Sequence, residues 1–269
     1  MATAVVAQEV AHQWWAHLVV PAPVEGAGVL TEVLAQYSAL MVLEKIYGPE
    51  MVQRFLWNTR IEYLNRRGRA THPEVPLLLV SDHPNLVYRK GPLAMYALRA
   101  YIGEKPLNDA LRTFLQKHGS GRPPYPTARD LHRELKAATP PSLHYLLEDF
   151  LATTTLWNLK TSAASAAPAG NGMWRVTMDV EAHKVRVDGI GRETEAPMND
   201  FVEIGVYAAA QDPNALGAPL YLQKQRIGSG VQRIVVTVRG EPAKVAIDPN
   251  LHLIDRNWSD NTRNVVLAK

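Results

Sequence analysis

The spacing of apolar residues changes near residue 160 and divides the chain into two parts. Before that point, apolar residues recur every three or four positions, which is typical of helices that bury one face. Beyond it, apolar and polar residues alternate, which is typical of strands with one buried face. The pattern predicts an α+β multidomain chain, with an all-α bundle over residues 1–160 and a small antiparallel β-sandwich over residues 173–269.

Proline, glycine and capping residues mark where the predicted helices begin and end. Pro21 and Pro23 stop the first helix, and Gly48 ends the second. Thr127, with Asp130 three residues later, resembles a capping box that opens a later helix. We expect helices over residues 3–20, 29–47, 50–66, 92–102 and 106–117, one that opens at residue 127, and one over residues 142–153.

Residues 161–172 are rich in Ser, Ala, Pro and Gly, and this composition predicts a linker between the two parts. The two-residue alternation begins after it. Gly and Pro turns separate the apolar runs at a spacing that is typical of sandwiches. Strands are expected around residues 174–180, 202–206, 221, 234–238 and 245–247.

The composition narrows the possible functions. Of the 269 residues, 46% are hydrophobic and 20% are charged, as in soluble globular proteins. No run reaches the roughly 18 apolar residues of a membrane span, and no signal peptide is recognised. We therefore expect a soluble chain, and the sequence does not indicate its cellular compartment. The net charge is +3 and no nucleic-acid-binding pattern is present, so nucleic acid is not an expected partner. The absence of cysteine leaves His and carboxylates as the ligands for any metal.

The first predicted helix carries an incomplete metal-binding motif. In zinc peptidases, H-E-x-x-H on a helix places two His on one side and a general base between them. Here Glu9 and His12 are in register, but Gln8 occupies the place of the first His. Glu32 is the natural third ligand, because the intervening Pro/Gly turn folds the second helix back. In a complete site, the metal would polarise a water, and Glu9 would take its proton.

Two further motifs extend this pattern into a family resemblance. The sequence QEVAHQWW (residues 8–15), the later Glu32, and YRKG (residues 88–91) resemble the gluzincin zinc aminopeptidases of the aminopeptidase N type. Their pattern is H-E-x-x-H-Q-W-[WF], then a ligand Glu, then Y-x-K-G. The resemblance implies the C-terminal half of a gluzincin catalytic domain with a β-domain behind it. It also implies zinc as cofactor, a peptide substrate, and a Tyr88 hydroxyl that stabilises the oxyanion.

A narrower resemblance concerns one bacterial branch of this family. The sequence QYSALM (residues 36–41) together with YRKG (residues 88–91) is similar to the branch in which the peptidase follows an ABC-2-type membrane permease. It implies a membrane permease as a partner. It also implies a bacterial cytoplasmic or membrane-associated location.

Three departures from the family pattern predict a weakened or inactive site. The amide of Gln8 is a poor zinc ligand beside an imidazole, so His12 and Glu32 are the two good ligands. The interval between them is one residue longer than the common spacing. The G-x-M-E-N strand that binds a substrate's amino terminus in this family is absent from the sequence. We therefore expect either that the sequence is a fragment of a longer protein or that the protein has lost the N-terminal half of the catalytic domain.

Several alternatives stay open at this stage. His17 or His83 could replace the missing ligand, although His17 is expected on another side of the helix. Glu9 and His12 could also be a buried polar pair, and Trp14 and Trp15 are expected in the core. The chain is then either a weakened peptidase or a non-catalytic module that binds a peptide or a partner. Helices without their usual neighbours should expose apolar surface and cause self-association.

Overall fold

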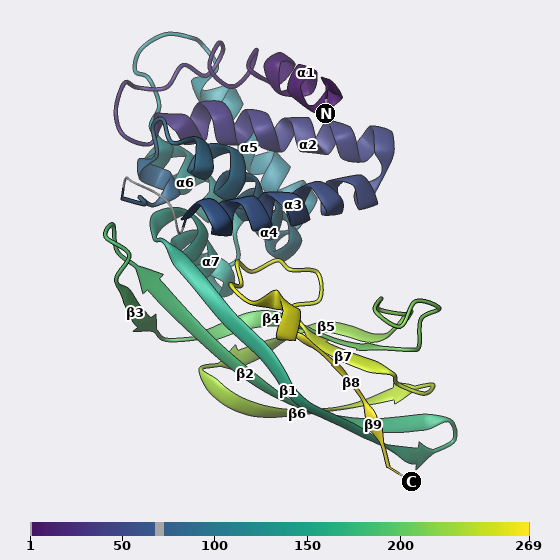
Figure 1. Cartoon of the computed structure of the whole chain (residues 1–269). Coiled ribbons are helices and arrows are strands. Elements are labelled where there is room, and N and C mark those ends of the chain that lie inside the picture. Colours follow the sequence, from purple (N-terminus) through teal and green to yellow (C-terminus); the bar gives the residue numbers. More distant parts are fainter. Residues whose placement is uncertain (1, 68–72, 269) are drawn as a thin grey trace. The chain divides into compact units, whose positions relative to one another are not determined.

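The computed structural model describes residues 2–67 and 73–268, and the chain divides into two compact units (Figure 1). The helical unit comprises Met1–Thr155 together with Val187–Arg192. The β unit comprises Leu156–Arg186 and Glu193–Lys269. Helices followed by strands make this an α+β protein, as the apolar pattern predicts.

The helical unit contains α-helices interrupted by short turns of other helical types. Three of these turns, η1 (Val29–Val33), η3 (Leu86–Lys90) and η5 (Glu148–Ala152), are π-helical, so their backbone hydrogen bonds span five residues instead of the four of an α-helix. The segments are α1 (Ala2–Ala11), η1 (Val29–Val33), α2 (Leu34–Tyr47), α3 (Pro49–Arg67), η2 (Leu77–Leu79), η3 (Leu86–Lys90), α4 (Gly91–Ile102), α5 (Glu104–His118), α6 (Ala128–Ala138), η4 (Pro141–Leu143), α7 (His144–Leu147) and η5 (Glu148–Ala152).

Most of the predicted helices are confirmed. The expected helix over 29–47 is η1 continued by α2, and the helix over 50–66 is α3. The capping box is also present, because the Asp130 carboxylate accepts a hydrogen bond from the Thr127 backbone N–H at 2.8 Å. The fourth helix begins earlier than expected, at η3, so Tyr88 lies inside a helical turn.

The predicted first helix is wrong beyond residue 11. The α1 helix ends at Ala11, and tight turns with hydrogen bonds from His17 N to His12 O and from Val19 N to Trp14 O follow it. Ala16 has φ 121°, which an α-helix cannot accommodate. Trp15 is buried and donates its indole N–H to Ser38 Oγ at 2.9 Å, so tertiary packing outweighs the helical spacing here.

The β unit contains two sheets (Figure 1). One has the order β3-β2-β1-β9, with β6 also paired to β2, and the other has the order β5-β4-β7-β8. In β2 the buried positions alternate, at Val176, Met178 and Val180 among others, and β2 pairs antiparallel with β6. The strands are β1 (Thr155–Gly170), β2 (Met173–Val187), β3 (Glu193–Ala196), β4 (Asn199–Tyr207), β5 (Pro219–Gly228), β6 (Gly230–Arg239), β7 (Lys244–Ile247), β8 (Thr262–Asn264) and β9 (Val266–Leu267).

The expected linker over residues 161–172 is wrong, because most of it belongs to strand β1. Thr161, Ala164 and Ala166 are buried, while the residues between them are largely exposed. Strands β2 and β9 flank β1 and satisfy its backbone, with Ser165 in parallel register with Val266. Small side chains therefore form a half-buried strand here, because partners far along the chain provide the hydrogen bonds.

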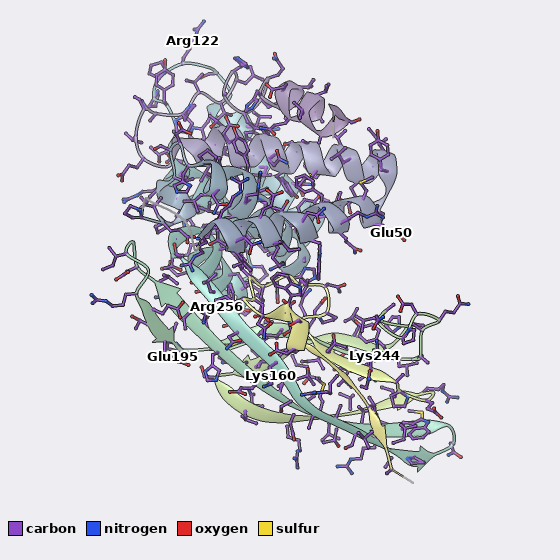
Figure 2. All side chains as sticks on the ribbon, viewed as in Figure 1. Glu50, Arg122, Lys160, Glu195, Lys244 and Arg256 are labelled. Carbon is purple, nitrogen blue, oxygen red and sulfur yellow. The ribbon has the colours of Figure 1, made fainter. Side chains whose placement is uncertain are left out.

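Glu50 and Arg122 of the helical unit are exposed, and Figure 2 shows their side chains extending outward. Across residues 2–67 and 73–268, no helix is both long and apolar enough to traverse a lipid bilayer.

Candidate functional site

Three residues of the predicted site converge on one oxygen atom of the fourth. The Tyr88 hydroxyl donates a hydrogen bond to Glu32 Oε2 at 2.7 Å, and Gln8 Nε2 donates to the same oxygen at 3.3 Å. His12 Nε2 lies 3.7 Å from that oxygen. Residues 56 positions apart in the sequence are thus brought within direct contact. We refer to Gln8, His12, Glu32 and Tyr88 as the Glu32 cluster.

Two π-helical turns present Glu32 and Tyr88 to the cluster. In η1, Val29, Leu30 and Val33 are buried, which leaves Glu32 on the less buried side of the turn. In η3, Leu86, Val87 and Lys90 are buried, and Tyr88 is half-buried. A π turn shifts the helical phase by about one residue, and such turns often occur at functional sites.

The third element of the cluster is α1. Its last turn carries Gln8, and His12 follows directly, with its backbone N–H still bonded to Gln8 O at 3.1 Å. Ala4 packs against the cluster of buried apolar residues that Leu40, Leu43 and Val52 form, which holds α1 on the helical unit. The two side chains four residues apart therefore point the same way, as helical geometry requires.

His12 is oriented by its own loop. Its Nδ1 lies 3.0 Å from the Trp15 carbonyl oxygen, so Nδ1 carries the proton and donates it. Nε2, the other ring nitrogen, faces the Glu32 carboxylate at 3.7 Å. Metal-ligating histidines commonly have this second hydrogen bond from the other ring nitrogen. The orientation suited to a ligand is thus retained at His12.

The electrostatic surroundings of Tyr88 are negative. Its pKa is raised to about 12, first by burial, then by the hydrogen bond to Glu32 and by the charges of Glu32, Asp82 and Glu9. Glu9 is exposed at the surface of α1, and Asp82 is also exposed. The hydroxyl therefore stays protonated at neutral pH and acts as a donor.

The residues of the cluster do not fit a catalytic zinc site. Such a site takes three protein ligands and a water, and the cluster offers one imidazole, one carboxylate and one amide. The amide group directs its N–H at Glu32 Oε2 rather than an oxygen toward a shared centre. Within the described part of the chain, no group of three His, Cys, Asp or Glu residues is placed to hold a metal ion.

Neither alternative histidine joins the cluster. His17 is exposed, and its Nδ1 lies 2.8 Å from the carbonyl oxygen of His12. His83 has a buried Nδ1 that makes no hydrogen bond within residues 2–67 and 73–268. The expectation for the two tryptophans is half right, because Trp15 is buried whereas Trp14 is 44% exposed.

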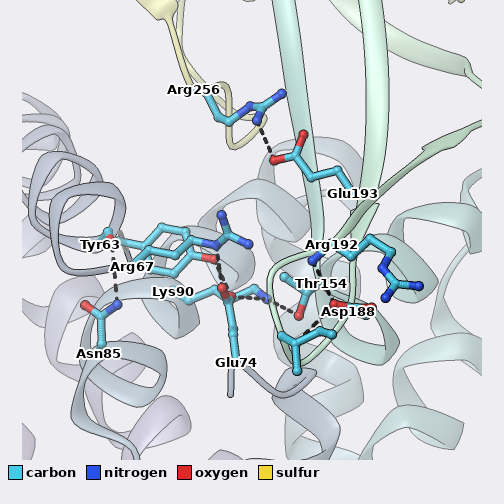
Figure 3. A network of polar contacts seen from close by, with 11 residues as sticks. Tyr63, Arg67, Glu74, Asn85, Lys90, Thr154, Asp188, Arg192, Glu193 and Arg256 are labelled. Carbon is cyan, nitrogen blue, oxygen red and sulfur yellow. Dashed lines mark hydrogen bonds and ion pairs between the residues drawn. The ribbon is translucent and has the colours of Figure 1, made fainter. Parts of the chain in front are cut away.

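A buried network around Glu74, which the motifs do not predict, includes Lys90, two residues after Tyr88 (Figure 3). Glu74 accepts hydrogen bonds from Tyr63 at 2.5 Å, from Arg67 at 2.5 Å, and from Lys90 Nζ at 3.1 Å. Lys90 is 1% exposed and also contacts Thr154 Oγ1 at 3.4 Å. Burial lowers the pKa of Lys90, and the Glu74 carboxylate opposes that shift. Since Lys90 belongs to η3, this network anchors the turn that carries Tyr88.

The family model described as the peptidase family M1 domain matches residues 1–150. No curated protein matches the chain.

Proposed function

This chain belongs to peptidase family M1, and from that premise we propose that it is a metallopeptidase-type domain whose own zinc site is incomplete and which does not hydrolyse peptides as it stands. The observation that carries the proposal is the hydrogen bond from Gln8 Nε2 to Glu32 Oε2 at 3.3 Å. It occupies a carboxylate that a family member would use as a ligand. Glu9, as base, and Tyr88, as oxyanion donor, have no activated water on which to act.

The identity of residue 8 is the main reason. A glutamine amide oxygen is a neutral and weak zinc ligand, and a second imidazole would bind far more strongly. His12 and Glu32 alone supply two good ligands, where a catalytic zinc takes three. The orientation of His12 supports a site that has lost one ligand and kept its surrounding geometry.

Calorimetric titration with zinc tests this proposal. The wild-type chain should bind zinc with a dissociation constant no lower than about 1 mM. Gln8→His should bind zinc at least about tenfold more tightly, a gain of roughly 1.4 kcal/mol, because it supplies a second imidazole ligand. Gln13→His is the matched control, because it adds an imidazole at an exposed position of the same segment. Micromolar binding by the wild-type chain, with chelator-sensitive cleavage of an aminoacyl substrate, would refute the proposal.

A non-catalytic peptide-binding role is the second candidate. Three carboxylates, those of Glu9, Glu32 and Asp82, act on the Tyr88 hydroxyl. Such a negative site suits the ammonium group of a peptide's amino terminus. Fluorescence anisotropy should then show that a labelled peptide binds, and that acetylation of its amino terminus or Glu32→Gln weakens binding. Equal binding of the free and acetylated peptides would contradict this role.

We further propose that the partner of this domain is a membrane permease. The support is the resemblance of residues 36–41 and 88–91 to the permease-linked branch. Co-purification from detergent-solubilised membranes of the source cell, with a tagged chain as bait, tests it. Recovery of no permease subunit would count against the proposal.

We also propose that the two sheets of the β unit pack face to face as a sandwich. Its support is the alternation of buried residues in β2, as at Val176 and Val180, and the burial of every residue from Val202 to Tyr207 in β4, which requires cover on both faces of its sheet. Such inner faces interdigitate in sandwiches.

A further inference from the structure

Gly91 and Val33 are in unusually close contact beside the Glu32 cluster. Gly91 follows η3 directly, three residues after Tyr88, and Val33 follows Glu32 in η1. A Cβ atom built on Gly91 would lie 2.6 Å from Val33 Cγ2 and 2.9 Å from Val33 Cγ1. Carbon atoms that are not bonded pack at about 3.5–4.0 Å. A residue larger than glycine therefore fits only if the Val33 side chain or one of the two turns moves.

Space, rather than backbone conformation, accounts for glycine at this position. Gly91 has φ −53° and ψ −54°, which any residue adopts in a helix. Glycine is unfavourable in helices because it loses the most conformational freedom on folding. The close approach of the neighbouring turn is the compensating reason, since the absence of a Cβ atom permits it.

The surroundings leave little room for relief elsewhere. Val33 is completely buried, and Gly91 is buried as well. Lys90, next to Gly91, is held in the helical unit by Glu74 at 3.1 Å. An added methyl group would therefore push η1 and η3 apart. The Tyr88–Glu32 hydrogen bond at 2.7 Å links these same two turns, and hydrogen bonds weaken steeply as they lengthen.

We infer that Gly91 is a positioning residue, whose contact with Val33 sets the distance between the Tyr88 hydroxyl and the Glu32 carboxylate. The contact brings the two π-helical turns close enough for a direct hydrogen bond. The inference concerns the same cluster as the proposed function. It holds whether or not zinc binds, because the contact and the hydrogen bond involve protein atoms alone.

The test measures the 13C chemical shift of Tyr88 Cζ at pH 7. The full-length chain is labelled with 13C at its tyrosines, and the Tyr88 resonance is assigned as the one that is lost in Tyr88→Phe. This resonance reports the hydrogen bond of the phenol and needs no metal. Glu32→Gln gives the reference position for a weakened bond. Gly91→Ala should move the Tyr88 resonance toward that reference, and Gly91→Ala with Val33→Ala should return it to the wild-type position, because removal of both Cγ atoms makes room for the new methyl.

Two further variants separate positioning from packing. Gly119→Ala is the matched control, since its Cβ would lie 2.5 Å from Leu115 O at the end of α5. It should lower the melting temperature and leave the Tyr88 resonance unchanged. Val33→Ile enlarges the same contact from the opposite side and should shift the resonance as Gly91→Ala does.

The outcomes are distinct. A Gly91→Ala protein that melts at a lower temperature but keeps the wild-type Tyr88 resonance overturns the inference. If Gly91→Ala does not fold, the decision passes to Val33→Ile, and an unchanged Tyr88 resonance in that variant overturns it. Zinc titrations of the Gln8→His protein are separate measurements, so the failure of the proposed function and the failure of this inference can be told apart.

Discussion

Glu32 Oε2 accepts two hydrogen bonds and faces an imidazole nitrogen, so a single oxygen connects α1, η1 and η3. In a metal site, a cation would offset the charge of such a carboxylate. Here the donors Gln8 and Tyr88 stabilise it instead, and each hydrogen bond to a charged group contributes about 1.5–3 kcal/mol. With glutamine at position 8, the described contacts of this carboxylate are therefore hydrogen bonds from side chains of the chain itself.

At the same scale, Asp255 in the β unit should make stability depend on pH. Burial raises its pKa from 3.8 to about 6, and a hydrogen bond from the Asn257 N–H partly offsets this. The folded protein thus holds a proton that the unfolded chain releases, and the free energy of unfolding falls as pH rises across that window. Between about pH 4 and pH 7 this group should remove about 2 kcal/mol.

Urea denaturation of the wild type and Asp255→Asn at both pH values measures this contribution. The variant cannot titrate at residue 255, so its free energy of unfolding relative to the wild type should rise by about 2 kcal/mol from pH 4 to pH 7. A difference that is the same at both pH values would show that Asp255 does not titrate in this range.

At the scale of elements, β1 is the clearest departure from the expected organisation. A strand and not a linker occupies residues 161–170, so substitutions at its buried and exposed positions should have different effects on stability. Ala164→Glu should lower the free energy of unfolding by at least about 2 kcal/mol, because it buries an unpaired carboxylate. Ala163→Glu, one residue away and exposed, should change it by less than about 0.5 kcal/mol. In a linker, both variants would be tolerated equally in chemical denaturation.

The capping box of α6 supports a second prediction at this scale. Thr127→Ala should destabilise the protein by about 1 kcal/mol, because the side chain that caps the helix is lost. Thermal unfolding followed by circular dichroism measures it. Arg129→Ala, at an exposed position of the same helix, is the control and should have little effect. A loss of similar size in both variants would assign the effect to the helix surface rather than to the cap.

At the scale of the whole molecule, the exposed apolar residues of the α1 region should cause self-association. Val6 is 61% exposed and Val10 53%, and Trp14 and Leu18 nearby are each 44% exposed. Exposed apolar side chains gathered in one segment of the chain favour association. Size-exclusion chromatography with light scattering should show a mass that rises with concentration. Val6→Lys combined with Val10→Lys should suppress this rise in mass. Val231→Lys is the control, because Val231 on β6 is 69% exposed, and it should leave the rise unchanged. A constant monomer mass would contradict this prediction.

Some elements of the fold could be predicted from the sequence, and others could not. Helices such as α2, α3 and α5, and strands β2, β4, β5, β6 and β7, could be predicted because their apolar spacing is a local property. The end of α1 could not, since it depends on Ala16 and on the contact between Trp15 and Ser38. Strand β1 was missed for the same reason, because its small residues carry little local preference and its partners are distant in the chain.

By itself, the sequence determined the membership of a peptidase family and the set of residues that form the Glu32 cluster. These follow from residue identity and spacing, which are local. Only the tertiary structure decided that Gln8 donates to Glu32, that Lys90 and Glu74 pair beneath Tyr88, and that Gly91 lets two π-helical turns meet. Each of these depends on atoms brought together from distant positions, and folding alone sets such distances.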